Sequence, residues 1–342
     1  MFLVEKTHLT SPFKLIAKKP SPISKNYQLA ARSFDEKVIL HLKTLIPASD
    51  SSNISLSWMS KAVSFLSMIH LEAQDQISNL RSESDYYQDL YMDYSQKVLD
   101  LCNLISSAVQ QLVDRRLLFN LSLRLINVNS SGQIPSPEKL KKAKDTLIRS
   151  VHHTQQTLKD KAQRAKDLLK ELTLDVNSLP IGKTGTAKDM IRRTLHGLGA
   201  LTVILAGVLV SVLYGPSDLV KVRVPADFPW ADSVTGVQKQ VFDLIKPKEA
   251  TDGGEEQRCL SELEDTVNRA RTVCDILDEV TGDGEGNDKD LVRLEDGRKE
   301  LSQAAAKFSD GVDKLTNGVN GLFSSVLKTR NGVLDGVRKC DW

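Results

Sequence analysis

Apolar residues recur every three or four positions along much of the chain. The first clear pattern covers residues 54–80, a second begins at Tyr87, and a third covers 138–172. This spacing places apolar side chains on one face of a helix. From Tyr94 onward the second pattern alternates steps of four and three, an average of 3.5 that indicates helices packed lengthwise. We predict long amphipathic helices, with 86–113 and 138–172 as scaffold helices.

Two further stripes of the same kind lie near the C-terminus, on either side of an acidic, glycine-rich loop at 281–290. The first stripe is Leu260, Leu263, Val267, Ala270, Cys274 and Leu277, and the second is Phe308, Val312, Leu315, Val319, Leu322 and Val326. Several glycines interrupt the second stripe. Each glycine inside a helix costs about 1 kcal/mol relative to alanine, so we expect this last helix to be the less secure one.

One segment differs from the amphipathic pattern. Residues 195–214 contain no charged residue. This length is close to the ~20 apolar residues that a membrane-spanning helix requires. A helix buried on all sides by its neighbours would have the same composition. The sequence leaves both interpretations open, a transmembrane helix or a core helix. The fold class predicted is all-α, a bundle of long amphipathic helices with one central hydrophobic helix.

Changes in composition divide the chain into four parts. Residues 1–32 are rich in lysine and proline and poor in acids, which predicts a disordered basic tail or, alternatively, an organelle transit peptide. Residues 33–174 form an N-terminal helical half. Residues 175–230 form a hinge that contains the hydrophobic helix. Residues 231–342 form a C-terminal helical half that includes the 281–290 loop.

Charge is balanced overall but uneven along the 342-residue chain. Forty-six Lys and Arg face 44 Asp and Glu, a net charge of +2 that gives no reason to expect nucleic acid as a partner. Residues 138–170 hold ten basic and four acidic residues, whereas 249–296 hold five basic and sixteen acidic ones. Such blocks are usually solvated faces. Alternatively the two blocks attract each other, or one of them docks a partner, for which 249–296 is the best candidate.

Motifs of catalysis and metal binding are weak in this sequence. Gly182-Lys183-Thr184 resembles the end of a phosphate-binding loop, but Asn177 stands where the first glycine is needed. The acids that begin at Asp283 lack the glycine and the glutamate of a calcium loop. His152 and His153 are adjacent on a predicted helix, so they cannot share a metal ion. We predict no catalytic residue, no metal site, no cofactor, and no enzymatic activity.

The four cysteines show no metal-binding or disulfide pattern. Their positions, without any CxxC pair, suit a reducing compartment. Cys102 lies in a helical stripe region, where a thiol acts as a small buried apolar group.

Several stretches resemble the plant BYPASS-related family, which includes the exocyst-interacting ROH-type proteins. The resemblance is carried by Ile54–Met59 (ISLSWM) and Tyr91–Ser107 (YMDYSQKVLDLCNLISS), with support from 195–214 and from Leu315–Val337. It covers most of residues 33–340. The sequence departs from the family in the acidic loop and in its C-terminal glycines. These glycines are Gly311, Gly318, Gly321, Gly332 and Gly336.

The resemblance implies a non-enzymatic plant regulatory protein of root and shoot development. One branch of the family is linked to limiting a mobile root-derived signal. Another branch is linked to exocyst subunits, which implies, as the alternative, a membrane-associated adaptor in exocytosis. Protein partners are expected in either case, with membrane association through 195–214 as a further option. The expected location is membrane-associated or cytoplasmic, with the plastid as an alternative.

Overall fold

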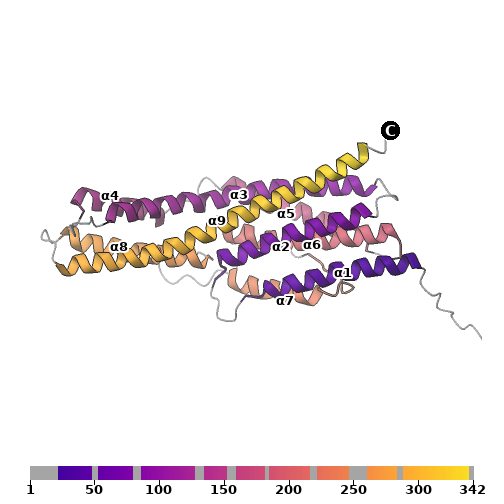
Figure 1. Cartoon of the computed structure of the whole chain (residues 1–342), viewed down its shortest axis with the longest axis horizontal. Coiled ribbons are helices and arrows are strands. Elements are labelled where there is room, and N and C mark those ends of the chain that lie inside the picture. Colours follow the sequence, from indigo (N-terminus) through magenta and orange to yellow (C-terminus); the bar gives the residue numbers. More distant parts are fainter. Residues whose placement is uncertain are drawn as a thin grey trace, which may run out of the picture.

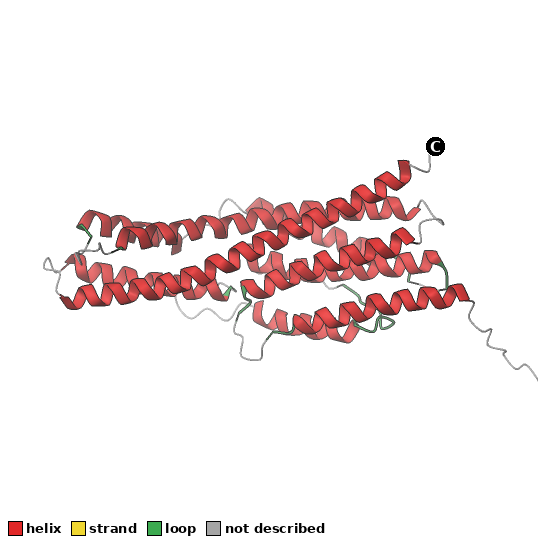
Figure 2. Ribbon diagram, in the orientation of Figure 1, coloured by secondary structure: helices red, strands yellow, loops and turns green. Residues whose placement is uncertain are grey.

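A computed structural model describes residues 22–47, 53–79, 86–127, 135–151, 159–181, 185–215, 222–245, 260–282 and 288–338. Among these residues the regular structure is helical, apart from an isolated parallel bridge between Ile54 and Leu260 (Figure 2). The helices are α1 (Pro22–Thr44), α2 (Leu56–Asn79), α3 (Tyr86–Ile126), α4 (Pro137–Val151), α5 (Lys159–Ser178), α6 (Ala187–Tyr214), α7 (Ala231–Ile245), α8 (Ser261–Gly282) and α9 (Asp288–Arg338). The prediction of an all-α bundle with one long apolar helix is confirmed.

The bundle is elongated, and α3 and α9 run along most of its length (Figure 1). At 1.5 Å per residue, the 51 residues of α9 extend about 76 Å. At one end α3 and α9 pack with α4 and α8, which we call the four-helix end. At the other, which we call the α6 end, they pack with α2, α5 and α6, while α1 and α7 lie outside. The two ends therefore share α3 and α9, and the predicted sequence halves intermingle in space.

The start of α1 differs from the prediction for residues 1–32. Residues 1–21 lie outside the described residues, but Pro22–Thr44 is helical, so the part from residue 22 onward is not an irregular tail. Proline is well suited to the first position of a helix because no backbone N–H is needed there. The missed signal is a stripe that begins with Ala31, Phe34 and Val38, all buried.

The long helices agree with the sequence stripes, with differences in length. α3 continues to Ile126, beyond the predicted end at residue 113. The predicted helix 138–172 corresponds to α4 and α5, and residues 152–158 between them lie outside the described residues. Arg115 Nη2 donates a hydrogen bond to the Val151 carbonyl at 3.1 Å, and Lys97 Nζ pairs with Asp175 at 2.6 Å. Both contacts show α4 and α5 following α3 in the opposite direction.

The glycine-containing C-terminal segment forms one continuous helix, α9. A Cβ atom at Gly311 would lie 2.7 Å from Leu56 Cδ1 of α2, so only glycine allows this approach. Seven residues later, Gly318 faces Val63, again seven residues after Leu56. The helices α2 and α9 thus run in the same direction with their backbones close together. At Gly311 and Gly318, packing against α2 offsets the cost of glycine, a role that the expectation of a less secure helix did not include.

Residues near the start of α8 complete the start of α2. The Ser261 backbone N donates to the Ile54 carbonyl at 2.9 Å, and the Leu56 backbone N donates to the Glu262 carboxylate at 2.9 Å. A carboxylate at a helix N-terminus satisfies a free N–H group and interacts favourably with the helix dipole. The carboxylate of Glu264 accepts a further hydrogen bond from Asn53. Segments about 200 positions apart thereby fix each other.

Candidate functional site

The apolar helix α6 lies inside the bundle. It packs against α2, α3 and α5, with further contacts to α1 and α7, and 24 of its 28 residues are buried. It is long and apolar enough to cross a membrane by length and composition, yet 89% of its apolar window is buried inside the protein. In this arrangement the apolar segment is the central helix of the α6 end, which accounts for its composition.

A buried ion pair joins α6 to α1. Arg193 Nη2 lies 2.7 Å from Asp35 Oδ2, and Trp230 Nε1 donates to the other oxygen, Asp35 Oδ1, at 2.9 Å. The Arg193 guanidinium also lies 4.0 Å from the centre of the Phe228 ring. Buried charges are tolerated when they are paired and when their remaining hydrogen-bonding groups are satisfied. This group of four residues therefore fixes α1, α6 and the segment before α7 to one another.

Two histidines lie in the interior of the same end. His196 Nδ1 lies 3.0 Å from the Val176 carbonyl, and burial lowers the pKa of His196. His70 lies against the ring of Tyr94, whose hydroxyl is 2.8 Å from Thr202 Oγ1. Burial lowers the pKa of His70 to about 3 and raises the pKa of Tyr94. Shifted pKa values often mark catalytic groups, but His70 and His196 are buried, and burial favours their neutral forms.

The acidic region 249–296 is largely engaged within the chain where the structure describes it. Lys144 of α4 pairs with Asp278 of α8, which brings the basic and acidic blocks together. Arg293 pairs with Glu279. Glu262 caps α2, so its charge contributes to the fold rather than to a free surface. Mutual attraction of the two blocks, one of the alternatives left open by the sequence, is therefore supported by the Lys144–Asp278 ion pair.

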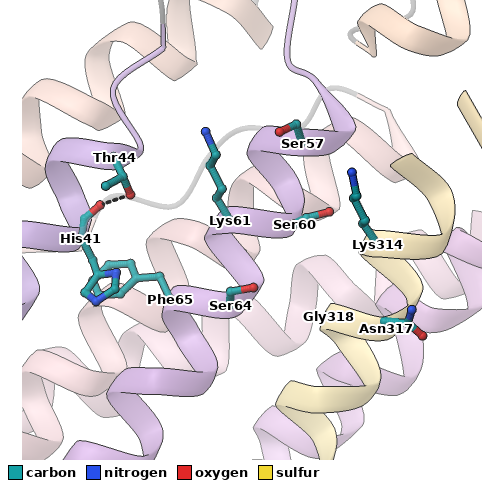
Figure 3. A pocket seen from close by; sticks show the side chains of 10 residues that line it. All are labelled: His41, Thr44, Ser57, Ser60, Lys61, Ser64, Phe65, Lys314, Asn317 and Gly318. Atoms are coloured by element: carbon teal, nitrogen blue, oxygen red, sulfur yellow. Dashed lines mark hydrogen bonds between the residues drawn. The ribbon is translucent and has the colours of Figure 1, made fainter. Parts of the chain in front are cut away.

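A polar groove opens on the side of α2, between the end of α1 and the middle of α9 (Figure 3). Its volume is about 570 Å³. We call it the basic groove, and it is lined by His41, Thr44, Ser57, Ser60, Lys61, Ser64, Phe65, Lys314, Asn317 and Gly318. The side chains of Lys61 and Lys314 extend toward the same side, with Ser57 between them. No sequence motif indicates this groove, because three helices contribute to it.

Most of the weak motifs from the sequence fall outside the described residues. These are Gly182-Lys183-Thr184, the pair His152 and His153, and the loop residues 283–287. Cys102 is buried in α3, and burial raises the pKa of its thiol to about 12, as expected of an apolar packing group. Within the described parts of the chain, no three His, Cys, Asp or Glu side chains are grouped to hold a metal ion.

Comparison with known proteins finds a family model and several plant proteins to which the chain is similar. A family model described as "Protein ROH1-like" matches residues 180–337, the part that holds α6 to α9. Protein BPS1, chloroplastic, of Arabidopsis thaliana is 26% identical over 333 residues, which cover 96% of this chain and 89% of that protein. No solved structure matches the chain.

A rice protein matches over a shorter region. UPF0496 protein 4, from both the indica and japonica subspecies of Oryza sativa, is 27% identical over 240 residues. The match covers 69% of this chain and 52% of the rice protein, so the chain spans about half the length of that relative. These matches confirm the resemblance to the plant BYPASS/ROH-like family that the ISLSWM and YMDYSQKVLDLCNLISS segments carry.

Proposed function

We propose that the chain is a non-enzymatic regulatory protein of plant root and shoot development, which acts by limiting a root-derived mobile signal. The observation that carries this proposal is the match to Protein BPS1, because it extends over nearly the whole of both chains. The interior polar groups support the non-enzymatic part of this proposal, because their contacts serve the fold. Asp35, Arg193 and His196 are engaged in packing contacts and hydrogen bonds inside the bundle.

Complementation tests this function directly. The full chain would be expressed in Arabidopsis plants that lack Protein BPS1, under the promoter of that protein, and root and shoot growth would be measured. We expect restored growth, and grafting onto rescued roots should restore the shoot as well. The matched control is an Asp35→Asn variant, whose loss of the buried pair should reduce rescue through instability. Failure of the wild-type chain at protein levels at which Protein BPS1 itself rescues would contradict the proposal.

The alternative function is a membrane-associated adaptor in exocytosis that binds exocyst subunits. It is favoured by the ROH1-like family model, whose match includes α6 and the acidic helix α8. The test is affinity purification of the tagged full chain from plant cells, followed by detection of exocyst subunits. A charge-reversed variant at Asp275, which is exposed on α8, leaves the α2 cap at Glu262 intact. Enrichment of these subunits that is lost in Asp275→Lys would support the adaptor.

Membrane association is tested separately, on a chain that carries no substitution. Membranes from cells that express a fluorescent fusion would be washed with alkaline carbonate. Retention in the washed pellet would support a spanning segment at 195–214 and the adaptor. Release would support α6 as a core helix. Substitutions such as Leu205→Asp are poor tests, because Leu205 is fully buried and the change would disrupt the bundle in either case.

A further inference from the structure

The basic groove presents donors and cations, and none of its lining residues carries a carboxylate. Lys61 is exposed on α2, and within the described residues no carboxylate forms an ion pair with it. An ammonium group in this setting is available to a ligand. Lys37 on α1 provides a contrast, because it is also exposed but forms an ion pair with Glu72.

The second cation of the groove is held only loosely. Lys314 Nζ lies 2.7 Å from Asp310 Oδ2 on the same helix, and both side chains are more than 60% exposed. Exposed pairs of this spacing are weak, because water screens the charges and holding both side chains costs conformational freedom. An incoming anion can therefore replace or share the Asp310 carboxylate.

Hydroxyl groups complete the donor set. Ser57, Ser60 and Ser64 follow one another at steps of three and four, so they line the same face of α2 between the lysines. Ser57 and Ser64 supply hydroxyl donors, whereas Ser60 Oγ donates its proton to the Leu56 carbonyl at 2.9 Å and can only accept, for example from a ligand hydroxyl. Asn317 adds an amide from α9. The cavity volume, about 570 Å³, falls in the range of small-molecule sites.

We propose that the basic groove binds a phosphate-bearing small molecule or lipid headgroup, with Lys61 and Lys314 contacting the phosphate oxygens and the serines contacting the remaining oxygens. Several ammonium and hydroxyl donors in a lining that contains no carboxylate match the many acceptor oxygens of a phosphorylated polyol. Binding there would bridge α2 and α9 across their close approach. This inference is independent of the developmental role, since it concerns a ligand and not a pathway.

The experiment uses the full-length chain and defined probes. Titration calorimetry would measure binding of inositol hexakisphosphate and of inorganic phosphate at low salt. Co-sedimentation would compare vesicles of phosphatidylcholine alone with vesicles that also contain a phosphorylated inositol lipid. Lys61→Glu should weaken binding about tenfold or more, since an ion pair becomes a repulsion. Asp310→Asn should tighten it, because Lys314 is then free. Lys328→Glu, an equal charge change at an exposed α9 position outside the groove, should have a smaller effect than Lys61→Glu.

Each outcome decides the proposal. Preference for the soluble inositol phosphate identifies a free phosphate ester, and preference for the phosphorylated vesicles identifies a headgroup, and both support it. Equal losses in Lys61→Glu and Lys328→Glu would overturn it, because the effect would then be general charge. Absence of binding by every probe, or Asp310→Asn binding no tighter than wild type, would overturn it as well. Circular dichroism of each variant checks that the helices are retained.

Discussion

The two ends of the bundle are built from the same two long helices but are held together differently. At the four-helix end, apolar stripes of α3, α4, α8 and α9 meet, and exposed ion pairs such as Lys144–Asp278 and Arg269–Glu300 join neighbouring helices. At the α6 end a nearly fully apolar helix is enclosed, and buried polar contacts centred on Asp35 and Tyr94 fix it in place.

This difference indicates that apolar burial supplies stability, whereas directional polar contacts determine which packing arrangement forms. At the four-helix end, the apolar stripes bury much surface, whereas the ion pairs between helices are exposed. Exposed pairs are weak, so few contacts there fix how the helices align along one another. An uncharged stretch such as residues 195–214 of α6 could by itself rotate or slide among its neighbours with little loss of burial. Directional contacts to Arg193 and Thr202 select one arrangement, because an unpaired buried polar group is costly.

The largest expected effect comes from breaking the buried pair. Asp35→Asn leaves the Arg193 guanidinium buried without a counter-charge, which should lower the free energy of unfolding by about 3–5 kcal/mol. Chemical denaturation of the purified full chain measures it. The matched control is Lys37→Gln, two positions along the same helix, where the exposed pair with Glu72 contributes less than about 1 kcal/mol. Equal effects of the two changes would remove the distinction between buried and exposed pairs on α1.

A smaller effect is expected where α9 approaches α2. Gly311→Ala places a methyl group against Leu56, which should destabilise the protein by about 1–3 kcal/mol. Gly321→Ala is the control, because nothing lies within 4 Å of its Cβ position and alanine favours the helix, so this change should stabilise by up to about 1 kcal/mol. Opposite signs in thermal unfolding support the close approach, and the same sign in both variants would argue against it.

The smallest effect is the dependence on pH from His70. Folded His70 stays neutral down to a pKa of about 3, whereas in the unfolded chain it binds a proton near 6.5. Stability is therefore lost as the pH falls from 6.5 toward 3, by about 1.4 kcal/mol per unit below 6.5. Between pH 7.5 and 5.5, His70→Leu should lose about 1.4 kcal/mol less than wild type. The lowered pKa of His196 acts in the same direction and remains in both proteins. If wild type and His70→Leu lost the same free energy of unfolding between pH 7.5 and 5.5, a group other than His70 would be responsible for the proton uptake.

Much of the fold follows from periodicity. The stripes of α2, α3 and α8 can be recognised because their buried residues are apolar and their exposed ones polar, and the family motifs lie at the start of α2 and on α3. The beginning of α1 was missed because the lysines and prolines before it dominate the composition, while its buried stripe is short.

The candidate sites could not be predicted from the sequence, for a different reason. Lys61 and Lys314 lie about 250 positions apart, and neither stands in a recognisable motif. Asp35, Arg193 and Trp230 are equally dispersed. Pairing of this kind depends on which helices become neighbours, and the stripes give the face of each helix that is buried but not the helix that covers it. The role of Glu262 as a cap for α2 was hidden for the same reason within a block that looked like a surface.

The contact between the starts of α2 and α8 has a consequence for biosynthesis. Leu56 receives its cap from a residue 206 positions later, and the partner stripe on α9 follows still further along the chain. Contacts so distant in sequence are slow to form and leave apolar surface exposed in the meantime. While the chain emerges from the ribosome, α2 and α3 remain without α9, and the apolar α6 is made before its full enclosure exists. Until α9 has been synthesised, the apolar faces of α2 and α3 must therefore be kept from contacting other chains.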